Sequence, residues 1–353
     1  MTDAAALNER VRQFVAARSV SDDRPAYACR PGESAELFGL LDAIYSLYVV
    51  KGLQSPEHAG QLGEAVAAWQ GEDGWFRSGD AQGHHRLHVT AYALGALALA
   101  SSDSGTDGFR RLVPIQGFVD ETEAALHGPD ALSLLDRIHF WRGSHKSGGI
   151  AAIVGQCHQA GWAGDLLGID DADAWLAAWA ERWDRAADAD GLWRFGSPLR
   201  ELFYIPYALR RHREPYAVIG GAAHIYWIHR RLDRAINAPA ALTDYILQRA
   251  GDRAICEDSP YCLDFDRLCL LEYALPHLGD TARARAAREL VRQSTEAIRT
   301  WFDSQPPAAW FASSHRLPGA LAAIAVGERV LGAEAKPQGD APLRDLLATA
   351  WWL

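Results

Sequence analysis

The chain has 353 residues, of which 49% are hydrophobic and 23% are charged, a composition typical of globular proteins with a large apolar core. Its formal net charge of -10 disfavours a nucleic-acid partner, because binding to phosphates requires a basic surface. No stretch approaches about 18 uninterrupted apolar residues, so no integral membrane segment is expected, and the acidic, amphipathic start argues against a signal peptide. We therefore expect a cytoplasmic protein with a small-molecule substrate; its oligomeric state stays open.

Six segments share one pattern, in which a loop rich in Gly, Pro, Ser or His leads into a strongly apolar helix. In chain order they begin at Pro31, His84, Ser144, Tyr216, Ser259 and Ser313. More polar, amphipathic helices are expected between them, for example after Pro56, from Asp170 and from Thr281. Helices that are apolar on all sides are buried, whereas those with a charged face lie outside. The alternation predicts a single all-α domain over residues 1–353, an (α/α)6 toroid of six helical hairpins.

The inner helices of such a toroid run in the same direction, so the loops before them share one rim. We expect these rim loops to contain His145, Lys146 and His224. Histidine is suited to proton transfer near neutral pH, which makes His145 and His224 candidate catalytic residues. The sequence also has 13 tryptophans and 11 tyrosines, residues that often line pockets. Candidate substrate-binding residues are His84, His88, Lys146, Tyr226, Tyr261 and Trp141. The five cysteines form no disulfide framework and are expected to be reduced thiols.

Two short segments carry a resemblance to a known superfamily. The segment QGEDGWF, Gln70 to Phe76, is similar to the Q-x3-G-x-aromatic repeat of terpenoid cyclases and protein prenyltransferase β subunits. The segment LDFDR from Leu263 resembles the D-x-D-D motif of class II cyclases. Asp264 and Asp266 match its first and second aspartates, and Arg267 replaces the last one.

This resemblance implies the α/α-toroid fold and isoprenoid chemistry. In class II cyclases the middle aspartate donates the proton, so the resemblance makes Asp266 the candidate acid and Asp264 a second candidate catalytic residue. Asp264 also stands at the start of a predicted helix, where a carboxylate is favoured by capping alone. Burial of Asp266 beside aromatic residues would raise its pKa and suit it to acid catalysis.

A metal site is a further expectation from the same resemblance. Prenyltransferase β subunits hold zinc with an aspartate, a cysteine and a histidine, and Cys262, Asp264 and His315 are the same residue types at comparable places. Their order is C-x-D here instead of D-x-C. No other cofactor is expected, and zinc is kept as a possible one.

Two other functions remain open. Glycosidases, lyases and sugar epimerases also use six-hairpin toroids, and a hydrolase would need two carboxylates across the cleft, such as Glu33 and Asp266. A toroid without catalytic activity, binding a ligand or a protein, is the other alternative.

Overall fold

The computed structural model describes residues 4–21, 23–53, 55–78, 85–133, 136–137, 139–193, 214–332 and 343–353. These residues are all-helical, and apart from two isolated bridges, Ser19–Tyr27 and Gln70–Phe76, they form no β-structure. None of the helices in these ranges is both long enough and apolar enough to cross a membrane. The all-α prediction is therefore confirmed for the part of the chain described.

Thirteen α-helices are present in the described ranges. They are α1 (Ala4–Ala16), α2 (Leu37–Val49), α3 (Pro56–Ala67), α4 (Arg86–Ser104), α5 (Phe118–Ala125), α7 (Phe140–Gln159), α8 (Ala163–Leu167), α9 (Ala172–Arg185), α11 (Glu214–Arg231), α12 (Pro239–Ala250), α13 (Cys262–Ala274), α14 (Ala282–Asp303) and α15 (Leu317–Leu331). Short 3-10 helices include η1 (Gly108–Arg111), η2 (Gly128–Ala131), η3 (Leu275–His277), η4 (Pro307–Ala309), η5 (Ser314–Arg316) and η7 (Leu346–Ala348).

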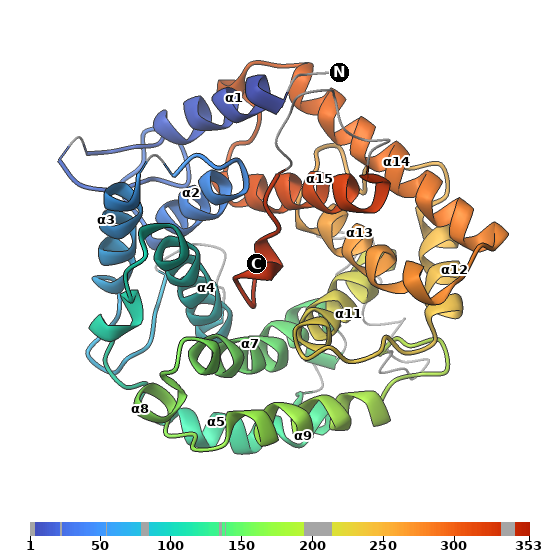
Figure 1. The fold of residues 1–353 in the computed structure, drawn as a ribbon, viewed down its shortest axis with the longest axis horizontal. Helices are drawn as coiled ribbons and strands as arrows, with labels where there is room; N and C mark the ends of the chain where they lie inside the picture. The colour runs from blue at the N-terminus through green and yellow to red at the C-terminus, as the bar shows by residue number, and fades with distance from the viewer. Residues whose placement is uncertain are drawn as a thin grey trace.

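Six helices contact one another in a closed cycle, in the order α2, α4, α7, α11, α13, α15 and back to α2. Figure 1 shows them around a common centre, with α1, α3, α9, α12 and α14 outside them. The difference follows from sequence. All 13 residues of α2 are buried, whereas α14 buries a stripe at helical spacing that includes Ala284, Ala287 and Val291 and exposes Arg285, Arg288 and Arg292. Thr281 caps α14 by accepting a hydrogen bond from the Ala284 N–H at 3.1 Å.

The segment from Leu343 to Leu353 enters the centre of the ring (Figure 1). Its backbone is held by inner-helix side chains. Tyr45 Oη donates to the Trp352 carbonyl at 2.7 Å, and Arg231 donates to the Leu347 and Ala348 carbonyls at 2.8 and 2.7 Å. Gly148 of α7 leaves room for this segment, because a Cβ there would lie 2.9 Å from the Trp352 ring.

The six predicted apolar helices are all present, as are the amphipathic ones at α3, α9 and α14, but two sites were misplaced relative to them. His145 and Lys146 were expected in a loop, yet α7 already begins at Phe140, capped by His139 Nδ1, which accepts from the Arg142 N–H. His224 was also expected in a loop and lies in the middle of α11. Both errors come from reading Gly and His as loop signals where close packing requires them.

Candidate functional site

Four histidines from four different elements gather at the centre of the ring. The His88 ring of α4 stacks on His145 of α7, with centroids 4.4 Å apart, and His145 lies 4.7 Å from His224 of α11. His315, in η5, lies 6.4 Å from His88. Trp352 contacts three of them, at 5.9 Å from His88, 6.2 Å from His145 and 4.7 Å from His224. The structure thus brings together His88, His145, His224 and His315, which the sequence could place only on one rim.

The hydrogen bonds of two of these histidines fix where their protons lie. Trp352 Nε1–H donates to His88 Nδ1 at 2.9 Å, so neutral His88 carries its proton on Nε2. The Ser144 hydroxyl donates to the Trp141 carbonyl at 2.6 Å, which leaves Ser144 Oγ to accept from His224 Nδ1 at 2.8 Å. His224 therefore has its lone pair on Nε2, where it can accept a proton.

Burial lowers the pKa of His224 well below its ordinary value, and the nearby His88 lowers it further. His224 is 3% exposed and His88 is 4% exposed. The imidazole of His224 is consequently neutral at physiological pH and available as a base.

His315 is oriented by a carboxylate that the sequence analysis did not select. Asp42 of α2 is buried; its Oδ1 lies 3.0 Å from His315 Nδ1 and accepts from Tyr92 Oη at 2.9 Å. Asp42 Oδ2 accepts from Ser314 Oγ at 2.7 Å. The sequence does contain a sign that Asp42 has a special role, because it is the one acidic residue in the apolar helix from Leu37 to Val49. When a carboxylate is hydrogen-bonded to Nδ1 of a histidine, it fixes the orientation of the ring so that Nε2 faces away from the carboxylate.

The two aspartates of α13 have different surroundings. Asp264 is fully buried and caps its helix: Oδ1 accepts from the Cys256 N–H at 2.8 Å, and Oδ2 from the Tyr261 N–H at 3.1 Å. Arg267, also fully buried, lies 3.5 Å from Asp264 Oδ1 and donates to Ser294 Oγ at 3.0 Å. Burial raises the pKa of Asp264, and Arg267 and the two N–H donors oppose that rise.

Asp266 is 0% exposed, and neither of its carboxyl oxygens has a hydrogen-bond partner in the described chain. Burial raises the pKa of Asp266 well above its ordinary value, and the charge of Asp264 raises it further. Arg267 donates to Asp264, to Ser294 and to the carbonyls of Arg253 and Ala254 instead of pairing with Asp266. Burial therefore favours the neutral form of the Asp266 carboxyl group. Asp266 is next in sequence to Phe265, whose ring lies 5.3 Å from Trp227, which lies 4.6 Å from His224.

The zinc ligands expected from the resemblance are not gathered together. Both Asp264 oxygens accept backbone N–H groups, and His315 is bonded to Asp42 of the neighbouring helix α2. Cys262 is half-buried, and desolvation and the charge of Asp266 raise the pKa of its thiol well above the ordinary value, which disfavours the thiolate that binds zinc. No group of three or more His, Cys, Asp or Glu residues suited to a metal is present in the described ranges, and all five cysteines are free.

The remaining predicted site residues are distributed over the molecule. Lys146 forms an ion pair with Asp136 at 2.6 Å, and the Trp141 ring lies 6.4 Å from His145. Tyr261 Oη donates to Glu257 at 2.6 Å, and Tyr226 Oη donates to the Gly191 carbonyl at 2.6 Å.

Two sequence predictions lie elsewhere. His84 is outside the described residues. Glu33 lies at the surface with 48% of its side chain exposed, 3.5 Å from Arg30, so it does not form a pair with the buried Asp266.

The segment from Gln70 to Phe76 is held by hydrogen bonds and ring contacts, several of them with neighbouring segments. Gln70 Nε2 donates to the carbonyls of Gly74 and Val113 at 2.8 and 2.9 Å, while its Oε1 accepts from the Val113 N–H at 2.8 Å. Trp75 Nε1 donates to the Gln116 carbonyl at 3.0 Å, and the Arg86 guanidinium lies 4.3 Å from the Trp75 ring centroid. These contacts attach the loop after α3 to the start of α4 and to the segment before α5.

Comparison of the chain with protein-family models, with curated proteins and with solved structures finds no match.

Proposed function

We propose that the chain is an (α/α)6 toroid of six helical hairpins and an enzyme that starts the cyclisation of an isoprenoid-type substrate by protonating it from Asp266. The closed cycle of six buried helices, with amphipathic helices packed outside it, supports the toroid. The observation that carries the activity is Asp266 itself, a fully buried carboxyl group with both oxygens unpaired in the described chain.

A buried carboxyl group without a partner is costly, and it is retained where its acidity is used. Its raised pKa favours the protonated form of Asp266, which a Brønsted acid requires. Protonation of a carbon–carbon double bond needs such an acid in surroundings that keep out water.

Aromatic rings near α13 suit the cation that protonation produces. Phe265, Trp227 and Trp352 form a chain of contacts, with centroids 5.3 and 5.6 Å apart. The faces of such rings attract a positive charge, by about 0.5–2 kcal/mol each. A carbocation beside these rings would therefore be stabilised by their faces.

The reaction is balanced in protons. Asp266 transfers its proton to one carbon of a double bond, the neighbouring carbon becomes cationic, and ring closure moves the positive charge along the chain. Loss of a proton to a base then gives a cyclic isomer of the substrate. His224 Nε2 is our candidate for that base, because Ser144 holds the ring proton on Nδ1 and burial keeps the imidazole neutral.

The test is incubation of the full chain with polyprenyl diphosphates of 10 to about 30 carbons in deuterated water, with products identified by mass spectrometry. We expect a cyclic product that contains one deuterium per molecule. Asp266→Asn should lower turnover by about 100-fold or more, because the amide cannot donate a proton to carbon. Asp244→Asn, at an exposed carboxylate of α12, is the matched control and should retain full activity.

Retention of turnover by Asp266→Asn would overturn the role of this residue. Conversion of neutral oligosaccharides, with no isoprenoid consumed, would replace the proposal by the carbohydrate alternative.

A further inference from the structure

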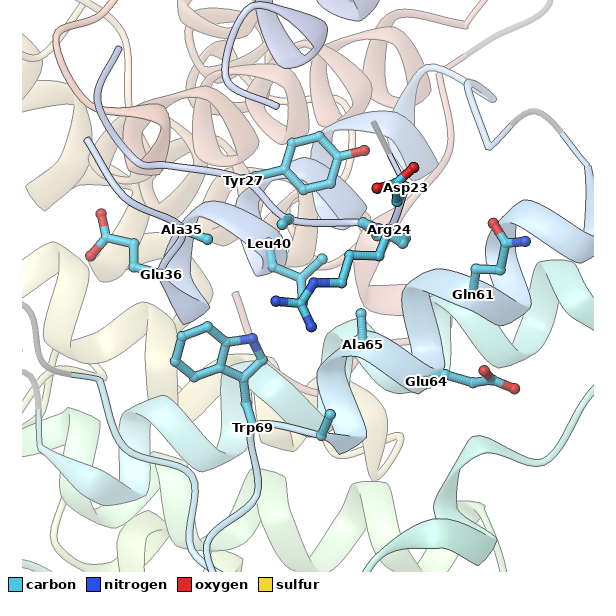
Figure 2. Close-up of a pocket in the computed structure, with 13 residues that line it drawn as sticks. Asp23, Arg24, Tyr27, Ala35, Glu36, Leu40, Gln61, Glu64, Ala65 and Trp69 are labelled. Atoms are coloured by element: carbon cyan, nitrogen blue, oxygen red, sulfur yellow. The ribbon is translucent and has the colours of Figure 1, made fainter. Parts of the chain in front are cut away.

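A pocket of about 610 Å³ lies away from the histidines, between the loop before α2, the first turn of α2 and the C-terminal half of α3. This volume is within the range of small-molecule sites, about 300–1,000 Å³. The residues that give it its chemistry are Asp23, Arg24, Tyr27, Glu36, Gln61, Glu64 and Trp69. Figure 2 shows Arg24 and Trp69 pointing into the same open space, with Tyr27 on its other side.

Trp69 presents a flat apolar face to this space. It is 41% exposed, one of very few large hydrophobic side chains that the described chain leaves in solvent, and its ring packs on no other aromatic side chain described. Exposure of the indole face to water is unfavourable, and a ligand with an apolar face would gain free energy by covering it. The aliphatic carbons of Leu40 and Ala65 extend the apolar part of the lining.

Planar polar groups surround the indole. The Arg24 guanidinium has neither an ion pair nor a hydrogen bond with any other described residue, so all its N–H groups are available. Glu36 accepts a hydrogen bond from the Cys29 N–H at 3.2 Å and also interacts with the Cys29 side chain. Glu64 is paired with Arg111, and Gln61 adds an exposed amide.

The charge balance of the pocket disfavours an anionic ligand. The lining has one cation, Arg24, against the carboxylates of Asp23, Glu36 and Glu64, and the whole chain carries -10. An anionic ligand would meet this excess of negative charge, whereas a neutral ligand can form hydrogen bonds with both the guanidinium and the carboxylates. A neutral ligand with one apolar face and many hydroxyl groups matches every part of the lining.

We propose that this pocket, which we call the Trp69 pocket, binds a neutral saccharide, with one pyranose face on the Trp69 indole and its hydroxyl groups bonded to Arg24 and Glu36. Vicinal hydroxyls match the two-pronged donor and acceptor groups of these side chains. The Trp69 pocket and the histidine cluster use separate residues, so neither proposal depends on the other.

The experiment is saturation-transfer NMR followed by titration calorimetry on the full chain, with a panel of neutral di- to hexasaccharides built from glucose, xylose, mannose, galactose and N-acetylglucosamine. We expect at least one of these series to bind. Trp69→Ala should weaken that binding by about tenfold or more, because the stacking face is lost. Arg24→Gln should weaken it by a smaller factor, since the amide keeps one of the two donor positions.

The matched control for Arg24→Gln is Arg110→Gln, which removes an exposed arginine outside the pocket and should leave binding unchanged. Circular dichroism and the unfolding midpoint of each variant show that the fold is retained. Failure of the whole panel to bind, preferential binding of the matching uronic acids or amino sugars, or undiminished binding by folded Trp69→Ala would each overturn the proposal.

Discussion

The two segments that resemble the terpenoid-cyclase superfamily differ in how their polar groups are satisfied. In the segment from Gln70 to Phe76, the Gln70 amide makes three hydrogen bonds and the Trp75 indole N–H makes one, all to backbone groups. In the segment from Leu263 to Arg267, Asp264 is equally well bonded, whereas Asp266 has no hydrogen-bond partner in the described chain.

This difference separates residues that hold the fold from a residue available for chemistry. A buried polar group with all its hydrogen bonds made stabilises the structure around it, and a buried polar group with none destabilises it. Two aspartates two positions apart on α13 therefore have opposite effects, and the same substitution at each should distinguish them.

The largest expected effect is that of Asp264→Asn. The amide has one acceptor atom in place of two, so an N–H of either Cys256 or Tyr261 is left unpaired, and the buried Arg267 loses its carboxylate. We expect the free energy of unfolding to fall by about 3–5 kcal/mol. Urea denaturation followed by circular dichroism measures it.

Asp258→Asn is the control for this change, because Asp258 is an exposed acid in the same loop. It should alter the free energy of unfolding by no more than about 0.5 kcal/mol. Equal effects of the two substitutions would show that Asp264 does not hold the start of α13.

Much of this arrangement follows from the sequence, and the part that does not follow has physical reasons. Helical periodicity located α2 and α14, because burial on all sides or on one stripe is written in the residue pattern. The pairing of Asp42 with His315 joins residues 273 positions apart, and no local pattern specifies such a contact. The Leu343–Leu353 segment is a similar case, since nothing in ATAWWL indicates that Trp352 contacts three histidines.

The roles of residues within the motifs were also only partly predictable. That Asp264 would cap a helix was an open alternative from its position, and the hydrogen bonds agree with it. The direction of the Arg267 side chain was not predictable. It donates hydrogen bonds to Asp264, Ser294 and two backbone carbonyls, and it forms no hydrogen bond with Asp266. Each residue of an α-helix is rotated by about 100° from the one before it. An error of one residue in the predicted start of a helix therefore changes the predicted direction of every side chain on it by about 100°.

The second prediction concerns pH. The pKa of Asp266 is raised in the folded protein from an ordinary value of 3.8, so the folded state binds this proton more tightly than the unfolded state. This contribution to stability is complete below the unfolded pKa and is lost as the pH rises towards the folded pKa. Asp266→Asn has no such proton. The wild type should lose stability relative to this variant by up to about 1.4 kcal/mol per pH unit between about pH 5 and the folded pKa.

Urea denaturation of both proteins at about pH 5, 6 and 7 measures the difference. Near pH 4 the two should agree within about 1 kcal/mol, because the neutral acid and the amide have nearly the same shape. Asp244→Asn, in which an exposed and ion-paired carboxylate is removed, should show no growth of the difference over this range. A difference between wild type and Asp266→Asn that stays constant with pH would mean that Asp266 is ionised in the folded protein.

The smallest expected effect is that of Gln70→Ala, which tests the other side of the comparison. Loss of the amide leaves the Val113 N–H and the carbonyls of Gly74 and Val113 without their partner, but these groups lie near the surface and water can replace it. We expect a loss of about 1–3 kcal/mol in the free energy of unfolding, against almost none for Gln61→Ala on the exposed face of α3. Because the segment from Gln70 to Phe76 holds the fold and contributes no group to the histidine cluster, the folded Gln70→Ala variant should turn over substrate at the wild-type rate. A large loss of turnover in a variant that remains folded would show that this segment acts on the chemistry as well, and the distinction between the two motifs would then fail.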